Sequence, residues 1–115
     1  MNPPDPTPHP LNSTPLLEAM VAGVRFRKLR LDPTKDSSIM LEHEPSNKYD
    51  PFAVKVNVVV AGAAPVHIGY IPKSASQTIA VLLHHNVLLR GKIIASDIQN
   101  GLILIHLFVG TNAHA

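Results

Sequence analysis

A short polar turn at residues 45–51 carries the side chains best suited to chemistry in this chain. It contains Asn47, Tyr49 and Asp50 between two prolines, and such residues are common turn formers. A valine-rich strand follows directly, so an amide, a phenol and a carboxylate stand at the mouth of a rigid element, where binding sites are often built. Asn and Asp also bond their own backbone in such turns. These residues alone leave both interpretations open.

A basic run is the second candidate. Four cations, Arg25 and Arg27 among them, fall within residues 25–30 with no acid between them. Phe26 lies between these two arginines, and an exposed aromatic beside guanidinium groups suits stacking on a base and pairing with phosphate. Phe26 also shares the phase of Val24 and could equally belong to the core, and most charge runs are solvated faces.

The other reactive side chains form no recognisable site. There is no cysteine, which excludes disulfides, thiolate metal sites and thiol catalysis. The seven histidines show no metal-binding spacing; His84 and His85, for example, would point about 100° apart on a helix. Ser74 and Ser76 lie at a helix start, where capping explains them, and no nucleophile-elbow or phosphate-loop motif is present. We therefore expect a non-catalytic protein without metal or cofactor.

Hydrophobic patterning predicts a mainly β domain. Val, Ile and Leu dominate after residue 50 and favour strands. Period-two alternation predicts six strands, and Asn100-Gly101 is a hairpin signal between the last two. The predicted strands cover residues 24–31 (with a bulge near 27–28), 39–43, 52–60, 66–71, 88–98 and 102–109.

A helix is predicted over about residues 73–86. Pro72 stops the preceding strand, and Ser74 and Gln77 fit a capping box. Its buried face would contain Ala75, Ile79, Leu82 and Leu83. Four strands, one helix and two strands with short connections predict a small, partly open antiparallel barrel, OB-like or SH3-like, with the helix at one end.

The ends of the chain differ from this domain. Residues 1–15 hold six of the eleven prolines and are predicted to be a disordered tail, with the folded domain at 16–110 and a flexible C-terminus at 111–115. No signal peptide or membrane-length apolar run is recognisable, so we expect an intracellular protein without a membrane partner. A net charge of +2 and a pI of about 9.2 are only weak evidence for nucleic-acid binding.

Residues 44–56 read Glu-Pro-x-Asn-x-Tyr-Asp-x-x-Ala-Val-x-Val, and this run resembles the signature of the HIRAN domain. Gly23-Val24-Arg25-Phe26 precedes it, and Ile68-Gly69-Tyr70-Ile71-Pro72-Lys73 follows in the family's order. The resemblance covers roughly residues 18–110. It implies a modified OB-like barrel that binds single-stranded DNA and recognises its free 3′-hydroxyl end.

The resemblance also implies roles for individual residues. Arg25 would contact phosphate, and Phe26 would stack on a terminal base. Asn47 and Asp50 would form the polar pocket around the terminal sugar, where a carboxylate accepts a hydrogen bond from a 3′-hydroxyl and repels a 3′-phosphate.

Four further positions complete the implied site. Tyr49 would brace the turn, and Lys73 would add positive charge for the nucleic-acid backbone. Arg27 stands where the best-known member has a second aromatic, which implies weaker stacking and stronger phosphate binding. Tyr70 replaces a histidine of that member and keeps an aromatic ring at the pocket. An aromatic residue that helps hold the bases near the C-terminal end of that member has no match near residues 100–101.

The leading interpretation is a monomeric module that binds single-stranded DNA 3′ ends in repair, replication or mobile-element processing, beside a helicase or nuclease partner. It would be nuclear in a eukaryote and cytoplasmic in a bacterium or virus. One alternative is a protein-interaction adaptor that uses the Pro-rich tail. Another is an accessory domain of a multidomain ATP-dependent helicase, hydrolase or nuclease, since hydrolase, helicase and zinc-binding activities would belong to the fused domains of relatives.

Overall fold

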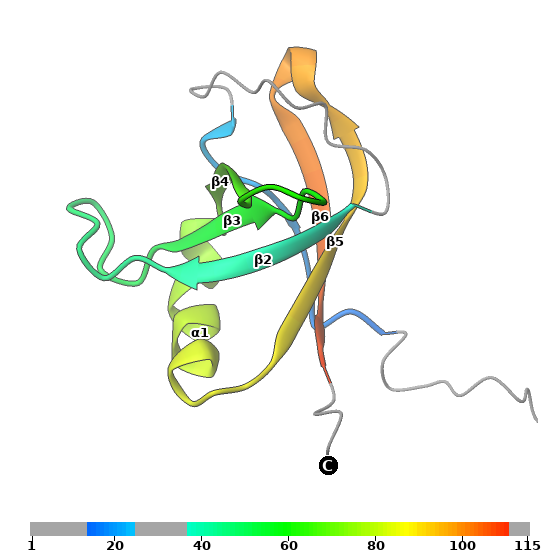
Figure 1. The fold of residues 1–115 in the computed structure, drawn as a ribbon. Helices are drawn as coiled ribbons and strands as arrows, with labels where there is room; N and C mark the ends of the chain where they lie inside the picture. The colour runs from blue at the N-terminus through cyan, green and yellow to red at the C-terminus, as the bar shows by residue number, and fades with distance from the viewer. Residues whose placement is uncertain (1–13, 25–36, 111–115) are drawn as a thin grey trace, which may run out of the picture.

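The computed structural model describes residues 14–24 and 37–110, which form a curled six-stranded antiparallel sheet with one α-helix beside it (Figure 1). The strands lie in the order β1-β6-β5-β2-β3-β4. A mainly β, OB-like half-barrel is therefore confirmed. The elements are β1 (Leu17–Met20), β2 (Ser38–His43), β3 (Val54–Val58), β4 (Val66–Tyr70), α1 (Lys73–His84), β5 (Leu89–Asp97), the short 3₁₀ helix η3 (Ile98–Asn100) and β6 (Leu102–Val109).

The core lies on the concave face of the curled sheet. Strand side chains alternate between the two faces, so every second residue of β3 and β6 points inward and is apolar. Residues such as Val56 and Ile105 are fully buried there. Helix α1 adds Ile79 and Ala80 to the same core. Within the described ranges, no helix is long and apolar enough to cross a membrane.

In the described part of the chain, an isolated β-bridge joins the two ends of the sheet. Ala22, just after β1, exchanges backbone hydrogen bonds with Tyr70 at the end of β4, at 2.8 and 2.9 Å. Gly69 makes this approach possible, because a Cβ there would lie 2.4 Å from Val21 Cγ1 and 2.5 Å from the Ala22 carbonyl oxygen. The pairing of β3 with β4 also shifts register next to Gly69. We call the Ala22–Tyr70 pair the seam.

Near the start of the fold one strand was missed and one predicted strand stays untested, and near the start of the helix one prediction is wrong. Strand β1 at Leu17–Met20 was not predicted, and the predicted strand at 24–31 lies almost wholly outside the described residues. Helix α1 begins at Lys73, with Pro72 as its N-cap and no capping side chain. The predicted capping box at Ser74 is therefore wrong.

The β5–β6 hairpin is confirmed, although its connection is longer than a two-residue turn. Asp97 pairs with Leu102 at the ends of the two strands, and η3 fills the gap between them. The Asp97 carboxylate accepts hydrogen bonds from the Asn100 backbone and side chain at 3.3 and 2.8 Å. Gly101 then takes the left-handed conformation, with φ 68°, which glycine adopts without strain.

Candidate nucleic-acid interface

Asn47 holds the polar turn together. Its Oδ1 accepts hydrogen bonds from the backbone N–H groups of Tyr49 and Asp50, at 2.9 and 3.0 Å. Its Nδ2 donates to Glu44 Oε1 at 2.9 Å. These three bonds use both lone pairs of the amide oxygen and one of two N–H donors. Asn47 therefore shapes the loop first and keeps one donor for a ligand.

Glu44 is a site residue that the sequence reasoning missed. The same Oε1 that binds Asn47 also accepts a hydrogen bond from the Tyr70 hydroxyl at 2.9 Å. Lys55 Nζ lies 3.9 Å from its other oxygen. The Asn47 hydrogen bond, followed by that of Tyr70, lowers the pKa of Glu44 below its usual value. Glu44 thus links the turn to the end of β4 and fixes the direction of the Tyr70 side chain.

Asp50 connects the turn to helix α1. Its Oδ1 accepts a hydrogen bond from the Phe52 backbone N–H, and its Oδ2 accepts one from Ser76 Oγ, both at 2.8 Å. Ser76 is a buried residue of α1, only 2% exposed, so the helix holds its hydroxyl in place. The Ser76 hydrogen bond, followed by that of Phe52, lowers the pKa of Asp50. The carboxylate is therefore ionised at neutral pH and held in one orientation.

Replacing Ser76 by alanine should raise the pKa of Asp50 toward its ordinary value of 3.8. A carboxylate whose pKa is depressed by folding stabilises the protein above its unfolded pKa, and this stability is lost as the pH falls through the folded pKa. Below about pH 4, the wild type should thus keep more of the folding stability that ionised Asp50 contributes than the Ser76→Ala variant does. Carboxyl titration by NMR measures the shift, with Ser74→Ala as control. An unchanged Asp50 pKa in Ser76→Ala would contradict this role.

Five of the eight predicted site residues surround one hollow of about 260 Å³. The hollow lies beside the seam, between the polar turn and the first turn of α1. Arg25, Phe26 and Arg27 lie outside the described residues, so their placement stays a prediction. The residues that line the hollow are Ala22, Asn47, Tyr49, Asp50, Ala53, Tyr70, Ile71 and Lys73.

The two tyrosines differ in how firmly they are held. Tyr70 is half-buried, bonded to Glu44, and packs edge-to-face against His67 with ring centres 4.9 Å apart. Tyr49 is 78% exposed, with Lys48 Nζ 5.2 Å from its ring centre. The prediction that the Tyr49 side chain braces the turn is therefore wrong. Asn47 and Glu44 perform that task, and the Tyr49 ring faces solvent at the edge of the hollow.

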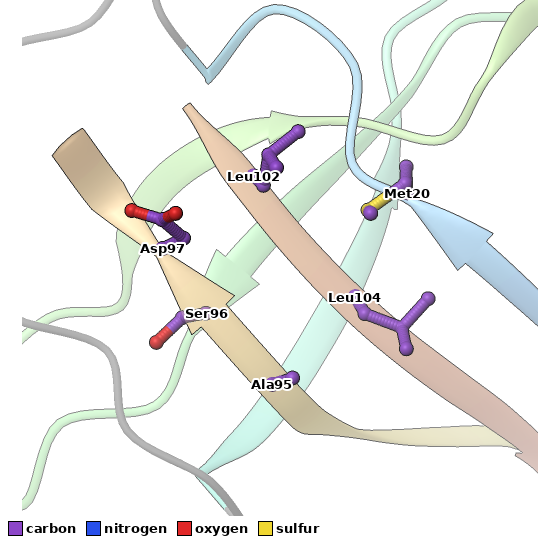
Figure 2. Close-up of a pocket in the computed structure, with 6 residues that line it drawn as sticks. All are labelled: Met20, Ala95, Ser96, Asp97, Leu102 and Leu104. Carbon is purple, nitrogen blue, oxygen red and sulfur yellow. The ribbon is translucent and has the colours of Figure 1, made fainter. Parts of the chain in front are cut away.

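Another hollow in the described part of the protein is chemically different. One of about 190 Å³ lies at the tip of the β5–β6 hairpin. Figure 2 shows Met20 and Leu104 projecting on one side of its strands, with the oxygen atoms of Ser96 and Asp97 pointing away from them. This hollow offers apolar contact and no convergent polar groups. Among the described residues, no group of three His, Asp or Glu side chains could hold a metal ion.

The comparisons with known proteins agree with this architecture. The family model of the HIRAN domain matches residues 16–109. The chain belongs to the HIRAN domain family. That family is one of DNA-binding modules, which makes the hollow the first surface to test for contact with DNA.

Two solved structures are similar to this HIRAN domain. The HIRAN domain of human HLTF matches with a TM-score of 0.66 and 22% identity, over 84% of this chain and 77% of that one. A structural-genomics protein from Lactobacillus plantarum matches with a TM-score of 0.60 and 25% identity, over 82% of this chain and 94% of that one. At such identities the likeness concerns the fold. No curated protein matches the chain.

Proposed function

We propose that this HIRAN domain binds single-stranded DNA and receives a free 3′-hydroxyl end in the hollow beside the seam. The observation that carries the proposal is the fixed, ionised carboxylate of Asp50 at the hollow, with Lys73 on the same lining. The Asp50 carboxylate can accept a hydrogen bond from the terminal 3′-hydroxyl, and the Lys73 ammonium can pair with the preceding phosphate. The domain would work without catalysis, inside the cell, beside a helicase or nuclease that supplies the chemistry.

Asp50 retains room for a ligand. A carboxylate offers about four lone-pair positions, and the bonds from Phe52 and Ser76 take one at each oxygen. A sugar hydroxyl could donate to either oxygen. A phosphate in the same place would bring a second negative charge against the carboxylate, and the two like charges would repel each other.

Helix α1 favours phosphate at the other side of the hollow. Its first residue is Lys73, and its N-cap residue, Pro72, makes no side-chain capping bond. The N–H groups and the dipole at a helix start attract anions, and the Lys73 ammonium adds to this attraction. The exposed ring of Tyr49 lies on the same lining, where a base could stack on it.

The test is binding of 5′-labelled oligonucleotides that differ only at the 3′ end. We expect tightest binding to a 3′-hydroxyl, on the order of 10-fold weaker binding to a 3′-phosphate, and similarly weak binding to a circular strand with no end. Fluorescence anisotropy measures all three, and a matched RNA strand tests the sugar preference. Equal affinity for the three DNA forms would rule out end recognition. Absence of binding to every form would rule out the nucleic-acid function.

A further inference from the structure

Basic and aromatic side chains lie together on the outer face of β5 and β6. Arg90 is paired across the strands with Phe108, and Lys92 with His106. Side chains paired in this way lie on one face of a sheet. Lys92 Nζ is 6.0 Å from the centre of the Phe108 ring, and the His106 ring centre is 6.2 Å from it. We call these four residues the basic–aromatic strip.

The inner face of the same strands explains why the strip points outward. Leu107 is fully buried between His106 and Phe108. Gly91 lies between the two cations, and a Cβ there would be 2.5 Å from Ile39 Cγ1 and 2.8 Å from Leu107 Cδ2. The backbone of β5 is thus pressed against the core. The cations are left exposed, and the two rings are half-buried beside them.

We propose that the basic–aromatic strip is a second contact surface for single-stranded nucleic acid, used by the interior of a strand and not by its end. Arg90 and Lys92 would pair with phosphates, and the Phe108 ring would carry a base. A positively charged track beside aromatic rings is how proteins bind single strands without reading sequence. The proposal rests on the proposed function and extends it from one terminal nucleotide to a longer segment.

The strip and the hollow lie toward opposite ends of β1. Leu17 is paired with Leu107, which is next to Phe108, whereas Ala22 is bridged to Tyr70 at the hollow. The five-residue step from Leu17 to Ala22 corresponds to about 17 Å at strand spacing. Stacked nucleotides advance about 3.4 Å each, so a strand that contacts both sites must be at least about five nucleotides long. Strand length should therefore decide whether the strip is used.

Glu18 limits the positive charge of the strip. Its exposed carboxylate accepts a hydrogen bond from His106 Nε2 at 2.6 Å. A carboxylate at this position repels a phosphate passing over His106. Glu18→Gln removes the charge and keeps an oxygen that can accept the bond. We expect this variant to bind long strands more tightly than the wild type and short strands equally.

The decisive experiment compares 3′-hydroxyl oligonucleotides of about four and about 16 nucleotides, the range of site sizes found for OB folds. Arg90→Ala/Lys92→Ala removes two phosphate contacts, and each contact accounts for about 0.7 of the slope of log K against log salt concentration. We therefore expect the double variant to bind the long strand about 20-fold more weakly at 0.1 M salt. Binding of the short strand and its preference for a 3′-hydroxyl should not change. Arg90→Lys/Lys92→Arg keeps the charge and should keep the slope.

The outcomes separate this proposal from the proposed function. If the double alanine variant binds the long strand like the wild type, with the same salt slope, the strip makes no contact and the proposal is overturned. Loss of the short strand as well would also overturn it, because the strip would then not be a separate surface. A wild type that prefers 3′-hydroxyl ends but binds both lengths equally overturns the strip alone, whereas a wild type that binds neither overturns both.

Discussion

Asp50→Asn should remove the discrimination between 3′-hydroxyl and 3′-phosphate ends while leaving the domain folded. An asparagine amide can keep both local bonds, accepting from the Phe52 N–H and donating to Ser76 Oγ, so the loop keeps its shape. What disappears is the negative charge, the only property of this side chain that repels a phosphate. We expect the affinity for a 3′-phosphate end to rise by about 10-fold, to the level of a 3′-hydroxyl end.

Asp97→Asn is the matched control for this substitution. Asp97 also holds a local turn through its carboxylate, but it lies at the tip of the β5–β6 hairpin and does not line the hollow. The control makes the same change of net charge and should leave end preference intact. Competition binding with the two end types measures both variants. A preference that survives Asp50→Asn would show that Asp50 does not face the strand end.

Gly69→Ala should reduce the free energy of unfolding by about 3 kcal/mol, the upper range for forcing extra atoms into a packed site. The new methyl group would overlap Val21 Cγ1 and the Ala22 carbonyl oxygen. The side chain of valine could move, but the carbonyl belongs to the seam and cannot move without breaking its bond to Tyr70. Since Ala22 and Tyr70 both line the hollow, the same variant should also lose its binding to strand ends.

Gly62→Ala separates crowding from backbone strain. Gly62 has φ 73°, and a Cβ there would meet nothing within 4 Å, so its cost should be only the roughly 1 kcal/mol of a left-handed alanine. Urea denaturation followed by circular dichroism measures both variants. Equal losses of unfolding free energy for Gly62→Ala and Gly69→Ala would mean that the close backbone approach at the seam does not contribute to the cost of Gly69→Ala.

Elements with strong alternation could be predicted from the sequence, and those that depend on a distant partner could not. Strands β3 and β6 have regular valine, isoleucine and leucine patterns, and the structure confirms them. Strand β1 reads Leu-Glu-Ala-Met, and several of these residues are good helix formers. It is a strand because Leu17 to Met20 pair with β6, some 85 residues later, and no local pattern records that pairing.

The site shows the same division. The turn residues Asn47 and Asp50 were predictable, because their side chains suit tight turns, and the structure brings them to one hollow with Tyr70 and Lys73. The roles of Glu44 and Ser76 were not predictable. The bonds from Tyr70 to Glu44 and from Ser76 to Asp50 each cross 26 residues. A serine near a helix start is normally read as a cap, and only the fold shows that Ser76 points to the turn.

The seam gives the hollow a further property. The lining comes from both sides of the Ala22–Tyr70 bridge, so a DNA end held there would span the junction where the two ends of the curled sheet meet. A ligand that binds only the closed form stabilises that form, and the stabilisation grows with the logarithm of its concentration above Kd. A bound DNA end would then favour the closed seam over an opened one. Opening of the seam would in turn weaken the binding of the DNA end.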